Sequence, residues 1–186
     1  MSAILLCGFP ASGKTTVAGI LASKLGYKVV GGTDILVELA KEHGYKPAGL
    51  SWWDTSEGIK FLRERASNPE FDIETDKRLA ALVEKGGVIV TSYTLPWLTS
   101  SGFKVWLDAS PDTRAKRMAE RDSTSVEEAK KIVELRDKEN AELYEKLYGI
   151  HFGKDLSPFD LVLDVNEIDA NRAAEIILEA FEKSGK

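Results

Sequence analysis

Short, unbroken apolar runs alternate along the chain with longer segments whose apolar residues recur every three or four positions. The first run, residues 3–7, has the pattern of a strand that is buried on both faces. It leads into a glycine-bounded loop and then into a predicted helix over 14–25, which has an apolar stripe and is ended by Gly26. Further short apolar runs predict strands at 27–30, 88–90, 103–107 and 161–163.

Helix-start and helix-stop signals fall between these predicted strands. The residues that form them are Thr33 or Asp34, Asp54 with Glu57, Asn68-Pro69, Ser110 with Pro111, and Ser125 with Glu128. A last amphipathic helix is expected over 173–181. Because the strands alternate with helices, we expect an α/β fold in which a five-stranded parallel sheet is flanked by helices.

The composition of the 186 residues suits one compact domain. Apolar residues at 43% and charged residues at 30% exclude a disordered, collagen-like or membrane-spanning chain. The formal charge of −5 argues against a nucleic-acid partner, because phosphate backbones are bound through a surplus of Lys and Arg. Cys7 cannot form an internal disulfide, and the first apolar run lacks the basic start of a secretion signal, so we expect a cytoplasmic protein.

A glycine-rich motif near the start of the chain carries candidate chemistry. It consists of Gly8, Phe9, Pro10, Ala11, Ser12, Gly13, Lys14 and Thr15, which match the phosphate-binding loop pattern. The glycines allow backbone N–H groups to point at phosphate oxygens, and the following helix adds the positive end of its dipole. Lys14 would reach the β- and γ-phosphates, and the Thr15 hydroxyl would bind a magnesium ion. The alternative is a glycine turn followed by a solvated lysine.

The chain resembles the nucleoside monophosphate kinases, and in particular the archaeal-type cytidylate kinases. The segments that carry the likeness are the loop with Thr16, Thr33-Asp34-Ile35, Asn68-Pro69-Glu70 with Asp72 and Asp76, Arg114-Ala115-Lys116-Arg117, Ser125-Val126-Glu127-Glu128-Ala129, Tyr148-Gly149-Ile150, and Leu156-Ser157 with Asp160-Leu161-Val162. The resemblance implies one P-loop NTPase domain of the kinase type over 1–186, with ATP bound at the loop, including Thr16. It also implies a helical acceptor-binding insertion over about 34–85 and a short lid over about 121–140.

The resemblance further assigns roles to single residues. Together with Lys14, the lid-side residues Arg117, Arg121 and Arg136 would be catalytic, because planar, always charged guanidinium groups can clamp the transferring phosphoryl group. The alternative for each arginine is an ordinary surface ion pair. The residues expected to bind the acceptor are Asp34, Arg63, Asp76, Arg78 and Tyr93.

Three positions depart from the pattern of that family. Val37, Tyr93 and Leu143 stand where such kinases usually carry arginines that surround the acceptor's phosphate. A phosphate without those partners would lose several charge-assisted hydrogen bonds. Replacement charge is available in the predicted insertion from Lys60, Arg63, Lys77 and Arg78. The spacing of these four residues also suits solvated helix faces.

The sequence leaves three readings of function open. The leading one is transfer of the ATP γ-phosphoryl group, with Mg²⁺, to CMP or dCMP. A second keeps ATP but replaces the nucleotide with a small non-phosphorylated acceptor, because three expected cations are absent. A third makes the chain a non-enzymatic, ATP-controlled interaction protein, although the presence of Lys14, Thr15 and the lid arginines counts against it. No nucleic-acid or membrane partner is expected, and we expect a monomer.

Overall fold

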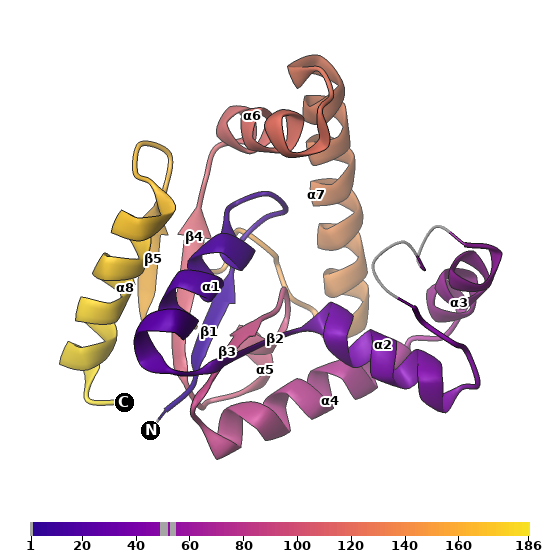
Figure 1. Cartoon of the computed structure of the whole chain (residues 1–186), viewed down its shortest axis with the longest axis horizontal. Coiled ribbons are helices and arrows are strands. Elements are labelled where there is room, and N and C mark those ends of the chain that lie inside the picture. The colour runs from indigo at the N-terminus through magenta and orange to yellow at the C-terminus, as the bar shows by residue number, and fades with distance from the viewer. Residues whose placement is uncertain (1, 49–51, 53–54) are drawn as a thin grey trace.

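Five parallel strands form the centre of the protein (Figure 1). The structure, a computed structural model, describes residues 2–48, 52 and 55–186. The strands are β1 (Ile4–Cys7), β2 (Lys28–Gly31), β3 (Val88–Thr91), β4 (Phe103–Asp108) and β5 (Leu161–Asp164), in the spatial order β2-β3-β1-β4-β5. Every pairing between neighbouring strands is parallel. The predicted five-stranded parallel sheet is therefore confirmed.

Helices cover the sheet and extend beyond its carboxyl edge. They are α1 (Lys14–Leu25), α2 (Gly32–Glu42), α3 (Ser56–Ser67), α4 (Glu70–Lys85), α5 (Leu95–Leu98), α6 (Pro111–Asp122), α7 (Val126–Tyr148) and α8 (Ala170–Ser184). Helices α1 and α8 lie on one side of the sheet, and α2, α3 and α4 lie on the other (Figure 1). Three helices, α2 to α4, thus separate β2 from β3 in the chain.

The side chains of β1 join the two sides of the core. Ile4 and Leu6 pack with residues of α1 and α8, whereas Leu5 packs with residues of α2 and α4. This division follows from the strand geometry, since successive side chains point to opposite faces of a sheet. All three side chains are buried, and burying each stabilises the fold by about 1.5–3 kcal/mol. A strand covered on both faces must be apolar at every position, as the sequence of β1 is.

Two of the predicted helix starts are confirmed in detail. The Ser110 hydroxyl accepts the backbone N–H of Thr113 at 3.1 Å at the start of α6. At the start of α7, the Ser125 hydroxyl accepts the N–H of Glu128 at 3.2 Å, and the Glu128 carboxylate accepts the N–H of Ser125 at 3.4 Å. The predicted capping box is thus formed, and such a cap contributes about 1 kcal/mol to a helix.

Other helix boundaries differ from the prediction or lie outside the described residues. Helix α2 begins at Gly32, before Thr33 and Asp34, and the Asp34 carboxylate accepts the N–H of Gly31 at 2.7 Å. Helix α8 begins at Ala170, three residues earlier than expected, because Asp169 caps it. The short helix α5 was not predicted, since four residues are too few to show a helical period. Asp54, a predicted cap, lies outside the described residues.

Candidate active site

The glycine-rich loop connects β1 to α1 at the carboxyl edge of the sheet, where ligands bind in open α/β folds. Gly8 has a φ of 140°, and a Cβ atom there would lie 2.5 Å from the carbonyl oxygen of Leu107. Gly13 has a φ of 100° at the start of α1. Larger residues would be strained at both positions. The two glycines of the sequence motif are therefore required by the backbone of this turn.

Lys14 is the first residue of α1, and its ammonium group folds back over the loop. Nζ donates hydrogen bonds to the carbonyl oxygens of Gly8 and Phe9, each at 2.8 Å. It also lies 4.8 Å from the centre of the Tyr93 ring. Burial lowers the pKa of Lys14 from 10.5 to about 8, and the positive charge of Arg136 acts in the same direction. The lysine is thus held at the loop in an environment that weakens its hold on the proton.

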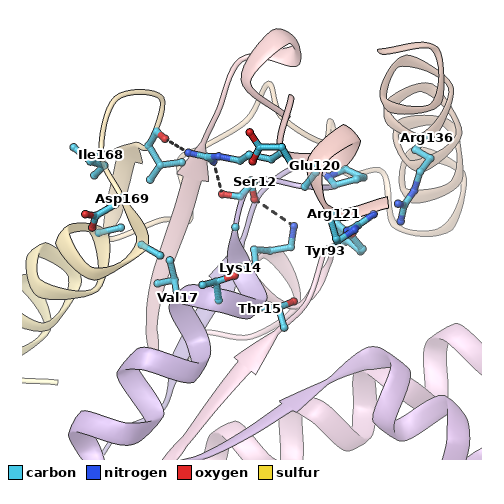
Figure 2. A pocket seen from close by; sticks show the side chains of 18 residues that line it. Ser12, Lys14, Thr15, Val17, Tyr93, Glu120, Arg121, Arg136, Ile168 and Asp169 are labelled. Atoms are coloured by element: carbon cyan, nitrogen blue, oxygen red, sulfur yellow. Dashed lines mark hydrogen bonds between the residues drawn. The ribbon is translucent and has the colours of Figure 1, made fainter. Parts of the chain in front are cut away.

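A first cavity, of about 890 Å³, opens beside the loop (Figure 2). Its volume lies in the range of small-molecule sites, roughly 300–1,000 Å³. It is lined by residues 10–17 of the loop and α1, by Tyr93, by Arg117, Glu120, Arg121 and Arg136 of α6 and α7, and by Val165, Ile168, Asp169, Ala170 and Ala173 near α8. The cavity therefore brings together segments that lie far apart in the sequence.

Most of the predicted ATP-binding residues line this first cavity, and Gly8 and Phe9 do not. Gly8 lies deeper, and its carbonyl oxygen is bonded to Lys14. The Phe9 ring contacts Trp106 and Phe152 with ring centres 5.5 and 5.1 Å apart. The side chain of Phe9 thus anchors the loop in an aromatic cluster, and only its backbone remains available to a phosphate.

The three predicted lid arginines all line the first cavity, in three different settings. Arg117 donates to the carbonyl oxygen of Ser12 at 3.2 Å and to that of Val165. Arg121 is paired with its neighbour Asp122 at 2.7 Å. Arg136 points from α7 toward Arg121 and Tyr93 (Figure 2) and pairs with no carboxylate among the described residues. Arg136 is therefore the member of the set that, among the described residues, is held neither by a carboxylate nor by a backbone carbonyl.

Arg114 has a structural role. Its side chain is 2% exposed, and it donates to both carboxylate oxygens of Asp137 at 2.8 and 2.6 Å. It also donates to the backbone carbonyl of Pro10 at 3.4 Å and lies over the Phe9 ring. One buried guanidinium group thus ties α6 to α7 and to the loop.

A second cavity, of about 410 Å³, lies on the other side of Lys14 and Tyr93. Its lining residues are Lys14, Thr15, Gly31, Gly32, Thr33, Leu36, Arg65, Asp72, Thr75, Asp76, Leu79, Thr91, Ser92, Tyr93, Thr94, Arg136, Asn140, Tyr144, Leu147 and Tyr148. Lys14, Thr15, Tyr93 and Arg136 line both cavities. Two ligands bound side by side would therefore meet at these four residues.

Asp76, which the sequence predicts to bind the acceptor, lines the second cavity. One carboxylate oxygen accepts the Thr94 hydroxyl at 2.7 Å, and the other accepts the Tyr148 hydroxyl at 2.7 Å. Burial raises the pKa of Asp76, and the two hydrogen bonds oppose that shift. The carboxylate thus links α4 to the segment after β3 and to the end of α7.

Three of the residues predicted to bind the acceptor do not reach this cavity. Arg78 donates to both carboxylate oxygens of Glu42 at 2.7 Å and to Glu74 at 2.9 Å, so it ties α4 to α2. Arg63 is exposed on α3, and the Asp34 carboxylate accepts a hydrogen bond from the backbone N–H of Gly31 at the start of α2. Asp34, Arg63 and Arg78 are therefore not among the residues that line the second cavity.

The other two candidate replacement cations are also outside the second cavity. Lys77 is exposed on α4, and Lys60 lies over the Tyr45 ring with Nζ 5.9 Å from its centre. Of the positions predicted to depart from the family pattern, Tyr93 lines both cavities, while Val37 and Leu143 line neither. None of the four predicted replacement cations of the predicted insertion therefore lines the second cavity.

Sequence reasoning missed one cation of the second cavity, Arg65. It stands in the last turn of α3 and donates to Asp72, in the first turn of α4, from Nη2 at 2.6 Å and from Nε at 3.3 Å. Seven positions and the break at Asn68-Pro69 separate the pair in the chain. No periodic pattern connects residues across such a break, so the pairing depends on how α3 meets α4.

Thr15 is the predicted magnesium ligand. Its side chain is exposed and lines both cavities. Mg²⁺ prefers oxygen ligands, retains several waters and commonly binds through phosphate groups. Among the described residues, no group of three His, Cys, Asp or Glu side chains could hold a metal ion. A hydroxyl at the junction of the cavities fits an ion that is held mainly by phosphates and water.

Comparison with known proteins identifies the family. The model of the cytidylate kinase-like family matches residues 4–167. The chain is 32% identical to a cytidylate kinase of Pyrobaculum arsenaticum over 181 residues, which cover 96% of this chain and 92% of the relative. It is 31% identical to a cytidylate kinase of Methanopyrus kandleri, with the same coverage of both chains. The chain therefore belongs to the cytidylate kinase-like family.

Solved structures show the same fold at low sequence identity. An uncharacterized protein from Eubacterium ventriosum has a TM-score of 0.72 at 17% identity, over 98% of this chain and 99% of that one. A shikimate kinase from Acinetobacter baumannii has a TM-score of 0.59 at 16% identity, over 99% and 94%. A gluconokinase from Sinorhizobium meliloti has a TM-score of 0.56 at 15% identity, over 98% and 93%. The fold is that of the P-loop kinases.

Family and fold together make the protein an ATP-dependent kinase. The reading as a non-enzymatic interaction protein is therefore not retained. Within the described ranges, no helix is both long enough and apolar enough to cross a membrane.

Proposed function

We propose that the protein transfers the γ-phosphoryl group of ATP to a pyrimidine nucleoside monophosphate, CMP or dCMP. ATP would occupy the first cavity, and the acceptor would occupy the second. The observation that carries this proposal is that the two cavities share Lys14, Thr15, Tyr93 and Arg136. The relatives named cytidylate kinase, at 31–32% identity over nearly the whole chain, support the choice of acceptor.

The loop and its lysine would bind the triphosphate. Backbone N–H groups of the loop and the start of α1 favour phosphate oxygens, because the helix dipole places partial positive charge there. Lys14 would leave the carbonyl oxygens of Gly8 and Phe9 to follow the β- and γ-phosphates. Bound through Thr15 and the phosphates, Mg²⁺ would neutralise charge that builds up between the phosphate groups.

The transfer itself needs no base from the protein. An oxygen of the acceptor's phosphate, already ionised near neutral pH, attacks the γ-phosphorus. The bond between the γ-phosphorus and the β,γ-bridging oxygen breaks, so ADP leaves and the acceptor becomes a diphosphate. Arg136, which faces both cavities, would stabilise the charge on the equatorial oxygens of the transferring group, and Arg121 would assist once Asp122 releases it.

Calorimetric titration of CMP into the protein with an unreactive ATP analogue tests the acceptor. We expect binding tighter than about 1 mM, which corresponds to about −4 kcal/mol. A coupled assay of ADP release should then show turnover with CMP and dCMP. No detectable heat and no turnover with CMP, dCMP, UMP or AMP would contradict the proposal.

A second candidate is a small acceptor that carries no phosphate. It is favoured by the groups of the second cavity, where Asp76 contributes a carboxyl group and Arg65 is already paired with Asp72. An unpaired phosphate dianion is costly to bury beside a carboxylate. The titration distinguishes the two candidates, because a non-phosphorylated acceptor predicts that CMP binds no more tightly than cytidine.

A further inference from the structure

Three cationic side chains line the second cavity among the described residues: Lys14, Arg65 and Arg136. Lys14 and Arg136 also line the first cavity, where the proposed function gives them to ATP and to the transferring group. Arg65 lines the second cavity alone. Any positive charge reserved for the acceptor therefore has to come from Arg65.

The geometry of Arg65 leaves part of its guanidinium group available. Asp72 accepts hydrogen bonds from Nε and Nη2, and Nη1 makes no hydrogen bond within the part of the chain that the structure describes. Arginine has five N–H donors in a rigid planar fork. Asp72 thus fixes the plane of the group while one edge of the fork remains unused. The side chain of Arg65 is 30% exposed, and Arg65 lines the second cavity.

Helix α7 forms the wall that relates Arg65 to Arg136. Arg136, Asn140 and Tyr144 follow one another at four-residue spacing and all line the second cavity, so they share one face of α7. Electrostatic effects of both Arg65 and Asp72 reach the Tyr144 hydroxyl, and that hydroxyl donates to Asn140 at 3.3 Å. Arg65 and Arg136 therefore line the same cavity, which this face of α7 borders.

Resting on the proposed function, we propose that Arg65 binds the phosphate of the nucleoside monophosphate acceptor, with Asp72 as its positioning residue. Nη1 would donate to a phosphate oxygen from the α3 side, while Arg136 approaches the same phosphate from the α7 side. Arg65 would thereby supply the charge that Val37, Tyr93 and Leu143 do not. This assignment replaces Arg63 and Arg78, which the structure places outside the cavity.

An arginine held by Asp72 is better prepared to bind the phosphate than an arginine on a free, solvated side chain would be. A guanidinium group on a free side chain loses rotamer entropy when it binds a ligand, and a carboxylate that already holds it reduces that cost. The carboxylate also weakens the field of Arg65. We therefore expect the contribution of one charge-assisted hydrogen bond to acceptor binding, rather than the larger effect of an isolated charge.

The test compares Arg65→Ala with Arg63→Ala, a matched control on the exposed face of the same helix. For Arg65→Ala we expect the KM for CMP to rise about 10-fold to 100-fold, the factor that one hydrogen bond to a charged group provides. The KM for ATP should change by less than about 2-fold, because Arg65 does not line the first cavity. Arg63→Ala should leave both constants unchanged. Arg65→Lys should recover part of the loss, since it keeps the charge without the fork.

Cytidine, which lacks the phosphate, separates phosphate binding from recognition elsewhere on the acceptor. Calorimetry with an unreactive ATP analogue should show that Arg65→Ala weakens CMP but not cytidine. Asp72→Asn should weaken CMP by a smaller factor than Arg65→Ala, because Nη1 is kept and only its orientation is lost. Equal weakening of CMP and cytidine, or a KM for CMP that matches that of Arg63→Ala, would overturn the proposal.

The same experiment separates this inference from the function on which it rests. If the wild-type protein turns over CMP and Arg65→Ala does so with unchanged constants, the function holds and the role of Arg65 is wrong. If the wild-type protein neither binds nor phosphorylates CMP, the proposed function fails, and the role of Arg65 fails with it. Unfolding midpoints of each variant, followed by circular dichroism, show whether a lost activity reflects a lost fold.

Discussion

Tyr93 lines both cavities. The ring lies 4.8 Å from Lys14 Nζ, and it stacks on Tyr144 of α7 with ring centres 6.0 Å apart. An ammonium group near an aromatic face gains about 0.5–2 kcal/mol, depending on how far it is desolvated. An arginine at this position would repel Lys14, whereas tyrosine attracts it without adding charge. Tyrosine at residue 93 therefore spares the Lys14 ammonium group the repulsion of a neighbouring guanidinium group.

At the scale of this single residue, we expect kcat/KM for ATP to fall as the pH rises through about 8. This parameter reports ionisation of the free enzyme. Because burial lowers the pKa of Lys14 to about 8, the ammonium group loses its proton in this range and with it the attraction for the β- and γ-phosphates. Steady-state rates from about pH 6.5 to 9.5 measure the profile. A level profile, in a protein that circular dichroism shows to stay folded, would assign Lys14 an ordinary pKa.

Among the elements, the junction of α6 and α7 depends on a buried ion pair. Arg114 of α6 is 1% exposed and bonded to Asp137 of α7, and the same guanidinium group contacts the loop. A second pair between the two helices, Lys130 with Asp112, is exposed and has a separation of 2.7 Å. The two pairs join the same helices and differ in burial, which makes them a matched comparison.

We expect Asp137→Ala to lower the free energy of unfolding by about 3 kcal/mol, because it leaves the buried Arg114 without its carboxylate. Asp112→Ala should cost less than about 1 kcal/mol, since exposed pairs contribute little. Urea unfolding of both variants measures the difference. Similar values for the two variants would show that burial does not decide the strength of these pairs.

For the molecule as a whole, the two cavities are built from different parts of the chain and meet at four residues. The first cavity depends on the loop, on α6 and α7, and on the segment before α8. The second depends on α2 to α4, on the segment after β3, and on α7. Helix α7, which contains most of the predicted lid, lines both cavities. A change on its inner face should therefore affect the reaction of the two substrates together.

We expect Arg136→Ala to lower kcat by about 100-fold or more while the affinity for ATP alone changes little. The physical reason is that a group facing both cavities acts on charge that develops only during transfer. Steady-state kinetics and calorimetry with an unreactive ATP analogue measure the two effects. Lys138→Ala is the control, because Lys138 is exposed on the same helix and pairs with Glu142. Unchanged turnover at saturating substrates would make Arg136 a surface residue without a catalytic role.

The sequence by itself determined the sheet, most helices and the loop, because each depends on residues that are close in the chain. Apolar runs such as 3–7 mark buried strands, and Ser125 and Glu128 form their cap within one helical turn. Gly8 and Gly13 adopt positive φ angles, which glycine tolerates and other residues rarely do. The sequence also selected Asp76, Tyr93 and Arg136, which the structure brings to the cavities.

The tertiary structure alone decided which charges face the second cavity. Arg63, Arg65 and Arg78 are the same residue type, and all three lie within the predicted insertion. Because of the packing among α2, α3 and α4, Arg78 pairs with Glu42 and Arg63 is exposed. The same packing places Arg65, paired with Asp72, at the cavity. The helical period determines which residues lie together on one face of a helix. Which part of the protein that face contacts depends on residues that are distant in the chain. The charge at the acceptor's place therefore follows from packing.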